Sequence, residues 1–380
     1  MAEHVEKILI ISLPGIGNTL LFTPALRLLR RRRPEARIDV LVEGTGSVQV
    51  LETNPDIDKV IDLRAAERGL CSLTTAWSLR ADEYDMSYTT FPSNRPRYNL
   101  FTWLVGARRR VIHSYPDCGA PALTFLQTDP VPARQGLHDI VQNIRLVSEQ
   151  AAYQAQCDGL PRPLLFLTET DRDFATDYWS QLPPGKPVIG IHPGSSAGKF
   201  HQQVAKRWPV EKFARAAELL VDELDATVLL FCGPDEEDLR DSLERQVSQR
   251  LHDRMYFPTG RLRQIAALIE KADAMVSNDS GLMHIAAALL TPVVALFGPT
   301  RPDRTGPPWE DCTILQAKST CQPCLDYPFI STRSAIRCRD FECWEGVRPE
   351  AVEVAVEELL SGDAEAPDSV KIWKTSVRNG

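Results

Sequence analysis

The chain has 380 residues, of which 43% are hydrophobic and 25% charged, a balance typical of folded globular proteins and not of disordered or fibrous ones. Because this length exceeds what one hydrophobic core usually organises, we expect two domains. Lysine and arginine number 43 and aspartate and glutamate 51, so the net charge of −8 argues against nucleic acid as the main partner. The sequence contains neither an apolar stretch of the roughly 18 residues that a membrane span needs nor a secretory signal, so we expect a cytoplasmic protein.

The first half of the sequence alternates short apolar runs with helical patterns. The run 7–13 is continuously apolar, which suits a strand covered on both faces of a parallel sheet. The helix after it either begins at Pro24 with Thr23 as its cap, or begins near Asn18 and kinks at Pro24. Further strands are expected at 38–42, 59–63, 86–89 and 111–113. This alternation predicts a doubly wound α/β domain over residues 1–175.

The same pattern restarts at Pro187, after a proline-rich stretch that we interpret as a linker region. Strands are expected at 187–191, 227–232, 274–277 and 292–297, and helices at 210–224, 236–249, 262–272 and 281–290. Because each half begins with a buried strand and a small-residue turn, we predict two Rossmann-like domains, the second over residues 187–348. A helix over 349–361 and a flexible tail over 362–380 complete the chain.

Three turns at strand ends contain residues suited to binding an anion, because glycine-rich turns and helix N-termini present backbone N–H groups. The turn 14–18 is the weakest, since its glycine spacing is not that of a dinucleotide-binding motif and also fits a tight strand-to-helix turn. The turn 192–199 combines hydroxyls, amides and a cation, which suits a diphosphate, and Lys206 follows it. The turn 278–284 places His284 one turn after a cap residue, although a capped helix and a packed histidine are the competing interpretation.

Together these motifs resemble the C-terminal half of the heptosyltransferase family, glycosyltransferase family 9. The matching segments are 192–196, 206–209, 233–236, 278–284 and 297–300, with looser matches at 24–26, 54–58 and 84–86. The resemblance implies the GT-B fold, in which two Rossmann-like domains face a central cleft and bind the acceptor and the nucleotide sugar respectively. It also implies inverting transfer of heptose from ADP-heptose to a saccharide or glycolipid acceptor, as in lipopolysaccharide core assembly, without an organic cofactor. Such an acceptor implies peripheral contact with the inner membrane surface.

The resemblance also implies roles for single residues. The donor site would comprise His192, Gly194, Ser195, Ser196, Lys206, Glu236, Gly260, Asp279, Ser280, Gly281 and His284. The turn 192–196 and Lys206 would hold the diphosphate, while Glu236 would meet the ribose and Gly260 would border the base. The segment 279–284 would surround the phosphates and the transferred sugar. Cations and amides around the leaving diphosphate stabilise its developing charge.

The family's usual aspartate in the N-terminal turn, the proposed catalytic base, is Asn18 in this chain. A side-chain amide does not accept a proton at neutral pH, so Asp85 is our first candidate for the base. The alternative hypotheses are that Asn18 orients the acceptor, or that the chain binds a nucleotide sugar without turnover. Transfer from another nucleotide sugar, epimerisation and a protein acceptor are further hypotheses for the function. Asp85 could also be a strand-end carboxylate bound to nearby backbone.

Four of the nine cysteines form the series Cys321, Cys324, Cys338 and Cys343. Two spaced pairs of thiolates can build a tetrahedral site, so the spacing predicts a structural zinc or iron ion. The competing interpretation is four reduced thiols, or two loosely oxidised pairs, in a surface insertion. Some relatives of the heptosyltransferase family, including ones that modify proteins, have a comparable insertion, which favours the metal and is compatible with a protein acceptor.

Overall fold

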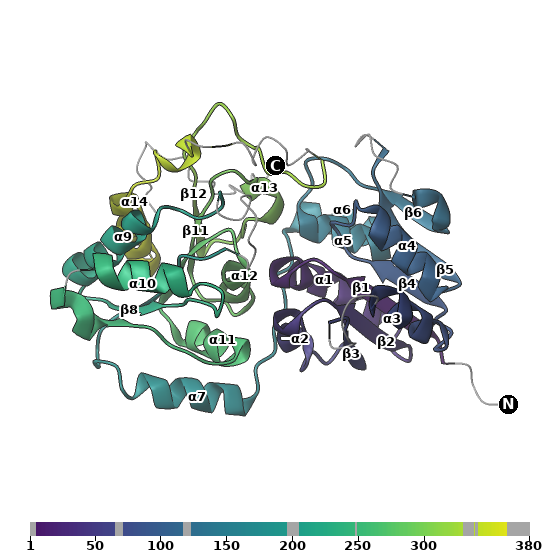
Figure 1. The fold of residues 1–380 in the computed structure, drawn as a ribbon, viewed down its shortest axis with the longest axis horizontal. Helices are drawn as coiled ribbons and strands as arrows, with labels where there is room; N and C mark the ends of the chain where they lie inside the picture. The colour runs from purple at the N-terminus through teal and green to yellow at the C-terminus, as the bar shows by residue number, and fades with distance from the viewer. Residues whose placement is uncertain are drawn as a thin grey trace. The chain divides into compact units, whose positions relative to one another are not determined.

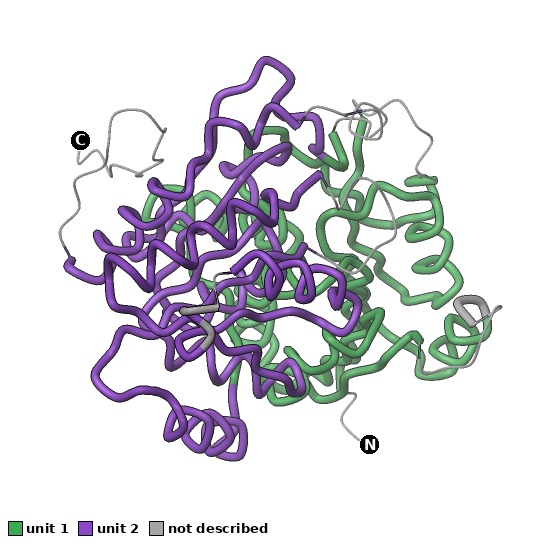
Figure 2. Tube along the Cα trace, turned by 60° about the vertical axis from the view of Figure 1, so that its left-hand side comes forward, with its two compact units in different colours: residues 1–166, 327–330 green, residues 167–326, 331–380 purple. Residues whose placement is uncertain are grey.

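The computed structural model of the chain describes residues 5–64, 71–116, 123–195, 205–247, 249–329, 338 and 341–362. The chain divides into two compact units, shown in Figure 2. Unit 1 comprises residues 1–166 and 327–330, and unit 2 comprises residues 167–326 and 331–380. Each unit contains a six-stranded parallel sheet with helices packed on it (Figure 1), which confirms the prediction of two doubly wound α/β domains.

The sheet of unit 1 has the strand order β3-β2-β1-β4-β5-β6. Its strands are β1 (Lys7–Ser12), β2 (Arg37–Val42), β3 (Lys59–Asp62), β4 (Met86–Thr89), β5 (Arg109–Ser114) and β6 (Asp129–Pro132). Its helices are α1 (Ile16–Arg32), α2 (Thr45–Leu51), α3 (Cys71–Arg80), α4 (Pro96–Val105), α5 (Asp139–Val147) and α6 (Glu149–Asp158), with a short 3-10 turn η2 (Thr124–Leu126). Leu9 and Ile11 pack against α3 and α4 in one core cluster, while α1 and α5 pack against each other. Side chains of a strand alternate between its faces, so both faces of β1 are buried.

Helix α1 runs without interruption through Pro24, so the helix begins near Asn18 rather than at Pro24. A proline cannot donate to the carbonyl four residues earlier, which here is that of Leu20. The Thr23 hydroxyl donates to this carbonyl oxygen at 2.7 Å and thereby satisfies it. The same hydroxyl accepts a hydrogen bond from the backbone N–H of Leu164. Thr23 therefore compensates for the proline inside the helix instead of capping a new one.

The sheet of unit 2 has the strand order β12-β11-β10-β7-β8-β9. Its strands are β7 (Val188–His192), β8 (Thr227–Leu230), β9 (Met255–Tyr256), β10 (Ala274–Asn278), β11 (Val293–Leu296) and β12 (Cys312–Leu315). Its helices are α7 (Glu169–Trp179), α9 (Val210–Leu224), α10 (Glu237–Gln246), α11 (Leu262–Lys271), α12 (Gly281–Ala288), α13 (Pro302–Thr305) and α14 (Pro349–Ser361), with 3-10 turns η3 (Gln249–Arg254) and η5 (Glu342–Trp344). The main core cluster joins alternate residues of β7, β8, β10 and β11 to α9 and α14.

Helix α7 corrects the expected domain boundary at residue 175. It packs against α11 of unit 2, and the Asp171 carboxylate accepts two hydrogen bonds from the buried Arg263 guanidinium. The division between the units therefore falls at 166/167. The apolar pattern of α7 is too weak to show from sequence alone which core it joins. Among the residues that the structure describes, no helix combines the length and apolar character needed to cross a bilayer.

Candidate active site

The turns that follow β7, β8, β10 and β11 lie at one edge of the sheet of unit 2. All six strands are parallel, so their carboxyl ends meet there, and β10, which ends at Asn278, pairs directly with β7, which ends at His192. The N-terminus of α12 begins at this edge, directly after Asp279 and Ser280. Most of the predicted donor-site residues are thus brought together, as the strand-end rule predicts for a ligand site of an α/β sheet. Ser196 lies outside the described residues.

His192 joins three of these turns. Its Nδ1 lies 2.9 Å from the Ser280 hydroxyl oxygen, and its Nε2 lies 3.3 Å from Oε2 of Glu236. A carboxylate only accepts hydrogen bonds, so Nε2 is the donor in the second pair. All three side chains are buried. Because buried polar groups are costly unless paired, this chain of contacts fixes the three turns relative to one another.

Glu236 supports the turn after β7. Its Oε2 also accepts from the Gly233 N–H at 2.9 Å, and Arg207 approaches its other oxygen at 3.8 Å. Burial by itself would raise the pKa of Glu236, but His192, the Gly233 amide and Arg207 together lower it to about 2. The carboxylate lies where a side chain at position 194 would begin, so any larger residue there would displace Glu236 from His192 and the Gly233 amide. The predicted role of Glu236 at the ribose is therefore accompanied by a clear positioning role.

Lys206 and Asp279 form an ion pair with an Nζ to Oδ2 distance of 2.6 Å. Burial would raise the pKa of Asp279, yet the charge of Lys206 and its hydrogen bond hold that pKa below its usual range. Burial lowers the pKa of His284 to about 4, which keeps its ring neutral at physiological pH. A lysine ammonium has three N–H donors, so Lys206 can retain Asp279 and still donate to a phosphate oxygen.

Asn278 is a positioning residue that sequence reasoning missed. Its Oδ1 accepts from the Trp208 backbone N–H at 3.0 Å, and its Nδ2 donates to the carbonyl oxygens of Pro193 at 2.7 Å and Gly194 at 3.2 Å. One fully buried amide therefore holds both the turn after β7 and the segment that contains Lys206. A signal was present in the sequence, since an asparagine that ends a buried strand needs several buried partners.

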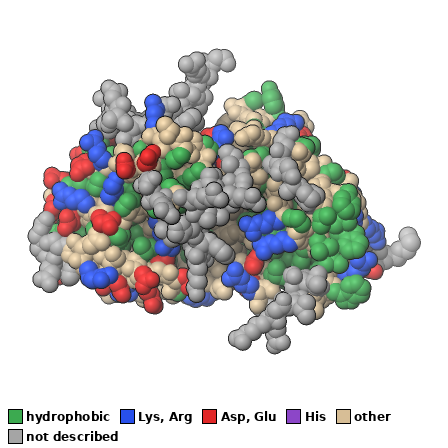
Figure 3. Space-filling model, turned by 45° about the horizontal axis from the view of Figure 1, so that its top comes forward, with side chains coloured by type: hydrophobic (Ala, Val, Ile, Leu, Met, Phe, Trp, Pro, Cys, Tyr) green, Lys and Arg blue, Asp and Glu red, His purple; other side chains and the backbone are tan. Residues whose placement is uncertain are grey.

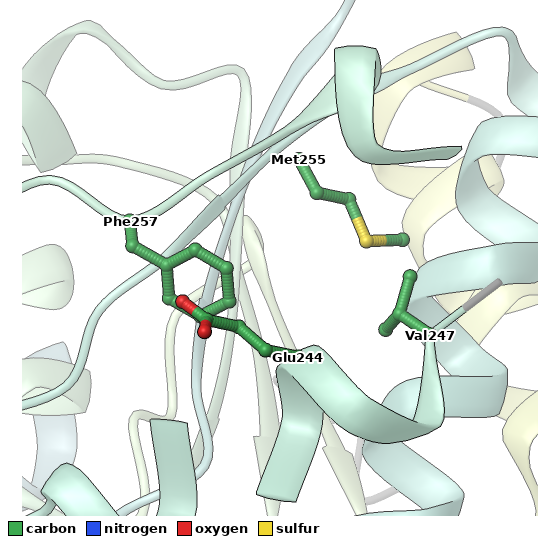
Figure 4. A pocket seen from close by; sticks show the side chains of 4 residues that line it. All are labelled: Glu244, Val247, Met255 and Phe257. Atoms are coloured by element: carbon green, nitrogen blue, oxygen red, sulfur yellow. The ribbon is translucent and has the colours of Figure 1, made fainter. Parts of the chain in front are cut away.

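Gly260 lies just before α11, in the segment that follows β9, whereas Ser280 follows β10 on the other side of β7 and β8. A pocket of about 250 Å³ is lined by Glu244, Val247, Met255 and Phe257 (Figure 4). In Figure 4 the Phe257 ring and the Glu244 carboxylate overlap at one side of the pocket, and Val247 and Met255 form the other. The pocket shares no lining residue with the turns around His192 and Asp279. The hydrogen-bonded turns, and not this pocket, therefore define the candidate site.

Asn18 lies in the first turn of α1, at the carboxyl end of β1 in unit 1. Near it, the hydroxyls of Ser12, Thr19 and Thr90 are joined at 3.2 and 3.3 Å, which connects the turn after β1 to the end of β4. The Asn18 side chain itself is partly exposed and makes no hydrogen bond with any residue that the structure describes. It is thus available to a ligand, as the prediction requires.

Asp85 does not lie at that edge, which argues against its predicted role as the base. It precedes β4, so it sits at the amino end of the sheet, whereas Asn18 follows β1 at the carboxyl end. Its Oδ2 accepts from the Lys7 backbone N–H at 3.0 Å, and its Oδ1 faces Arg108 at 3.4 Å. This is the strand-end carboxylate of the competing interpretation. His113, the histidine of β5, is not a candidate base either, because both its ring nitrogens contact backbone carbonyl oxygens in the core.

The four clustered cysteines lie in unit 2 beside the candidate site. The Cys324 N–H donates to the Pro299 carbonyl at 3.1 Å, and Trp344, next to Cys343, donates its indole N–H to the Ala205 carbonyl at 2.8 Å. Burial, with smaller contributions from the other three thiols, raises the pKa of Cys343 to about 12. Among the described residues, however, no group of three or more His, Cys, Asp or Glu side chains is arranged to hold a metal ion. The predicted coordination site is therefore not supported by these side-chain positions.

Comparison with known proteins matches residues 75–332 to the family model for glycosyltransferase family 9 (heptosyltransferase). The chain is 29% identical to lipopolysaccharide heptosyltransferase 2 of Escherichia coli strain K12 over 309 residues, which cover 79% of this chain and 85% of that protein. The structure of E. coli ADP-heptose lps heptosyltransferase II superimposes with a TM-score of 0.72 at 24% identity, covering 94% of this chain and 99% of that one.

A more distant structural neighbour is the dodecameric iron-containing heptosyltransferase TibC in complex with ADP-D-beta-D-heptose. It shares the fold with a TM-score of 0.54 at 14% identity, over 95% of this chain and 78% of that one. These likenesses confirm the GT-B fold that the sequence motifs indicated. Since the family model covers more than half of the sequence, the chain belongs to glycosyltransferase family 9, the heptosyltransferases, and is a glycosyltransferase.

Proposed function

We propose that this protein transfers a heptosyl group from ADP-heptose to a hydroxyl of a saccharide or glycolipid acceptor, of the lipopolysaccharide core type. The observation that carries the proposal is the network of His192, Glu236, Lys206 and Asp279 at the carboxyl edge of the unit 2 sheet. The family membership and the heptosyltransferase relatives support the same donor class. The relatives that match over most of the chain are heptosyltransferases, which favours this reaction over epimerisation or transfer from another nucleotide sugar.

In this proposal the diphosphate binds between the turn after β7 and the N-terminus of α12. The Lys206 ammonium and the first backbone N–H groups of α12 compensate the charge that develops on the leaving diphosphate. The acceptor oxygen attacks the anomeric carbon from the opposite face, and the bond from that carbon to the diphosphate oxygen breaks with its electron pair leaving on ADP. His284, neutral in its buried position, contacts the transferred sugar without adding positive charge.

The remaining donor residues have supporting roles in the proposal. Glu236 reaches toward the ribose while it fixes His192, and Gly260 borders the base at the start of α11. Ser195 and Gly281 line the phosphates with backbone amides. Asn18 orients the acceptor hydroxyl through its amide, and the proton released on transfer passes to solvent water, because a side-chain amide does not accept a proton at neutral pH.

We also propose that the four cysteines bind a structural iron or zinc ion. The spacing of the two cysteine pairs and the iron-containing neighbour TibC support this ligand set. The four side chains would have to draw together around the ion, because the described positions hold no ready-made site. The ion would supply a structural cross-link within unit 2.

A glycolipid acceptor further suggests a cytoplasmic protein in peripheral contact with the inner membrane surface, and the acidic composition suggests no nucleic-acid partner.

One experiment tests the proposed transfer. The protein is incubated with ADP-heptose and a panel of saccharide, glycolipid and protein acceptors, and the products are identified by mass spectrometry. A product heavier by one heptosyl residue, with release of ADP, is expected for a glycan acceptor. Binding of ADP-heptose without any release of ADP over long incubation would instead identify a binding protein that has lost turnover. Modification of a protein acceptor alone would change the acceptor class.

A further inference from the structure

Large hydrophobic side chains are exposed together on one face of unit 1. Of the eight large hydrophobic side chains exposed among the described residues, four belong to three neighbouring elements of unit 1: Trp77 of α3, Leu100 and Trp103 of α4, and Phe125 of η2. Their exposed fractions reach 69% for Trp77, 45% for Trp103 and 81% for Phe125. We call these four residues the aromatic face. In Figure 3 hydrophobic side chains gather at the right of the view with lysine and arginine side chains beside them.

Hydrogen bonds show that the three elements are contiguous. Arg80 at the end of α3 donates to the Leu104 carbonyl of α4, and its guanidinium lies over the Trp77 ring at 5.9 Å. Gln127, directly after η2, donates to the Asn99 carbonyl of α4 at 2.9 Å, which holds η2 beside the helix. Leu100 and Trp103 are three residues apart, so they share the outer face of α4. The four residues of the aromatic face therefore belong to three contiguous elements.

The segment that forms α4 and the start of β5 is basic, although Asp82, Glu83 and Asp85 lie just before it in the sequence. Residues 86–116 contain five arginines and no aspartate or glutamate, in a protein of net charge −8. Arg108 and Arg109 follow α4 directly, with side chains 72% and 58% exposed. Arg108 forms an ion pair with Asp85, and Arg109 forms one with Asp129. Arg95 and Arg97 are exposed at the start of α4, so arginines flank the aromatic residues at both ends of the helix.

We infer that the aromatic face docks on the surface of an anionic lipid bilayer. Tryptophan and phenylalanine side chains insert at the headgroup level of a membrane, and arginines beside them bind the anionic headgroups. A protein partner would also accept an apolar patch, but the exposed arginines at both ends of α4 favour a partner of uniform negative charge. The inference rests on the proposed membrane contact of the acceptor and extends it by naming the surface that makes it.

Vesicle binding tests this inference without depending on transfer activity. The full chain is sedimented with vesicles of phosphatidylcholine alone or with about 30% phosphatidylglycerol. The measurement is made at roughly 0.05 and 0.5 M salt, because the Debye screening length shortens with salt and weakens electrostatic attraction to the vesicle surface. We expect binding to the anionic vesicles only, weakened at least tenfold at high salt. Brominated lipids should quench tryptophan fluorescence on binding, and Trp77→Ser with Trp103→Ser should remove most of the quenching and reduce binding at least tenfold.

Matched control variants distinguish binding through the aromatic face from non-specific binding of other exposed side chains to the vesicles. Tyr153→Ser removes an aromatic side chain that is 71% exposed on α6 and should leave vesicle binding unchanged. Arg108→Gln with Arg109→Gln should weaken binding by about fivefold per arginine, whereas Arg215→Gln with Arg240→Gln in unit 2, of the same charge change, should not.

Three results would overturn the inference. They are absence of binding to anionic vesicles, unchanged binding of the double tryptophan variant, and an oligomer of the wild-type chain that this variant dissociates. The last result would make the face an interface between copies. Because the variants avoid the donor site, transfer to a water-soluble acceptor should be unchanged in them. Variants that lose vesicle binding but still transfer heptose to a water-soluble acceptor would therefore support both the inference and the proposed function.

Discussion

At the scale of single residues, Lys206 is the cation of the candidate site that pairs with the buried Asp279, so its loss should affect both stability and chemistry. Lys206→Ala removes a charge-assisted contact to the leaving diphosphate, and we expect kcat/KM for ADP-heptose to fall by more than tenfold. The basis is a typical cost of about 1.5–3 kcal/mol for a hydrogen bond to a charged group. Lys271→Ala, at the end of α11, is the control. Unchanged kinetics at limiting and saturating donor would remove Lys206 from the diphosphate site.

Glu236 predicts a pH dependence of stability. Against the cost of burial, its partners lower its pKa from 4.5 to about 2 in the folded chain. A group with a depressed folded pKa stabilises the fold above its unfolded pKa and loses that contribution as the pH falls toward the folded value. We expect about 2 kcal/mol of this contribution to be lost between pH 6 and pH 3.

Urea unfolding of the wild type and of Glu236→Gln at these two pH values measures the contribution. The variant should be less stable at pH 6 and should lose less stability on acidification, so the two unfolding free energies converge. Parallel losses in both proteins would show that Glu236 has an ordinary pKa in the folded state.

Asn18 predicts a gain of activity. If it orients the acceptor hydroxyl, Asn18→Asp places a proton acceptor at the same position and should raise the chemical step by about tenfold or more, since a general base typically contributes 10²–10⁴. Single-turnover kinetics with saturating donor reports this step. Asp85→Asn, at the opposite edge of the sheet, should leave it unchanged. If Asp85→Asn slows the chemical step while donor binding stays normal, Asp85 would again be the candidate for the catalytic base.

At the scale of elements, the turn after β7 depends on one glycine. In Gly194→Ala the new Cβ would overlap the Glu236 carboxylate, which also holds His192 and the Gly233 amide. We expect donor affinity, measured by calorimetry with ADP, to fall at least tenfold. Gly233→Ala is the matched control, because a Cβ there would lie 3.4 Å from Oε2 of Glu236, an ordinary contact. Equal affinities in both variants would mean that the turn is not part of the donor site.

At the scale of the whole molecule, the segment 321–343 contains the predicted metal ligands and also hydrogen-bonds to residues beside the donor turns. Metal analysis of protein purified without chelator should find about one iron or zinc ion per chain, and Cys321→Ser with Cys324→Ser should abolish it. Since Cys324 and Trp344 bind the carbonyls of Pro299 and Ala205, we expect that variant to raise KM for the donor several-fold with a smaller change in kcat. Cys157→Ser, on the exposed surface of α6, should change neither. Metal-free protein with four titratable thiols in the series would exclude the ion.

The sequence by itself determined which residues stand at strand ends. Apolar runs and small-residue turns are local signals, and in a parallel sheet every residue that follows a strand reaches the same edge, which places His192, Asp279 and Asn18 at carboxyl edges. The same rule places Asp85 at the amino edge, because it precedes its strand. Residue type alone favoured Asp85 as a base, whereas its position relative to the strand argues against that role.

Only the tertiary structure decided which partners these residues have. Asn278 holds two segments, one about 70 and one about 85 residues away in sequence, and Glu236 meets His192 across 44 residues. Such pairs depend on strand order, which brings β7 between β8 and β10, and no local pattern encodes that order. The aromatic face likewise arises because α3, α4 and η2 are packed side by side. Local propensity acts between sequence neighbours, whereas burial, ion pairing and exposed surface are properties of the assembled layers.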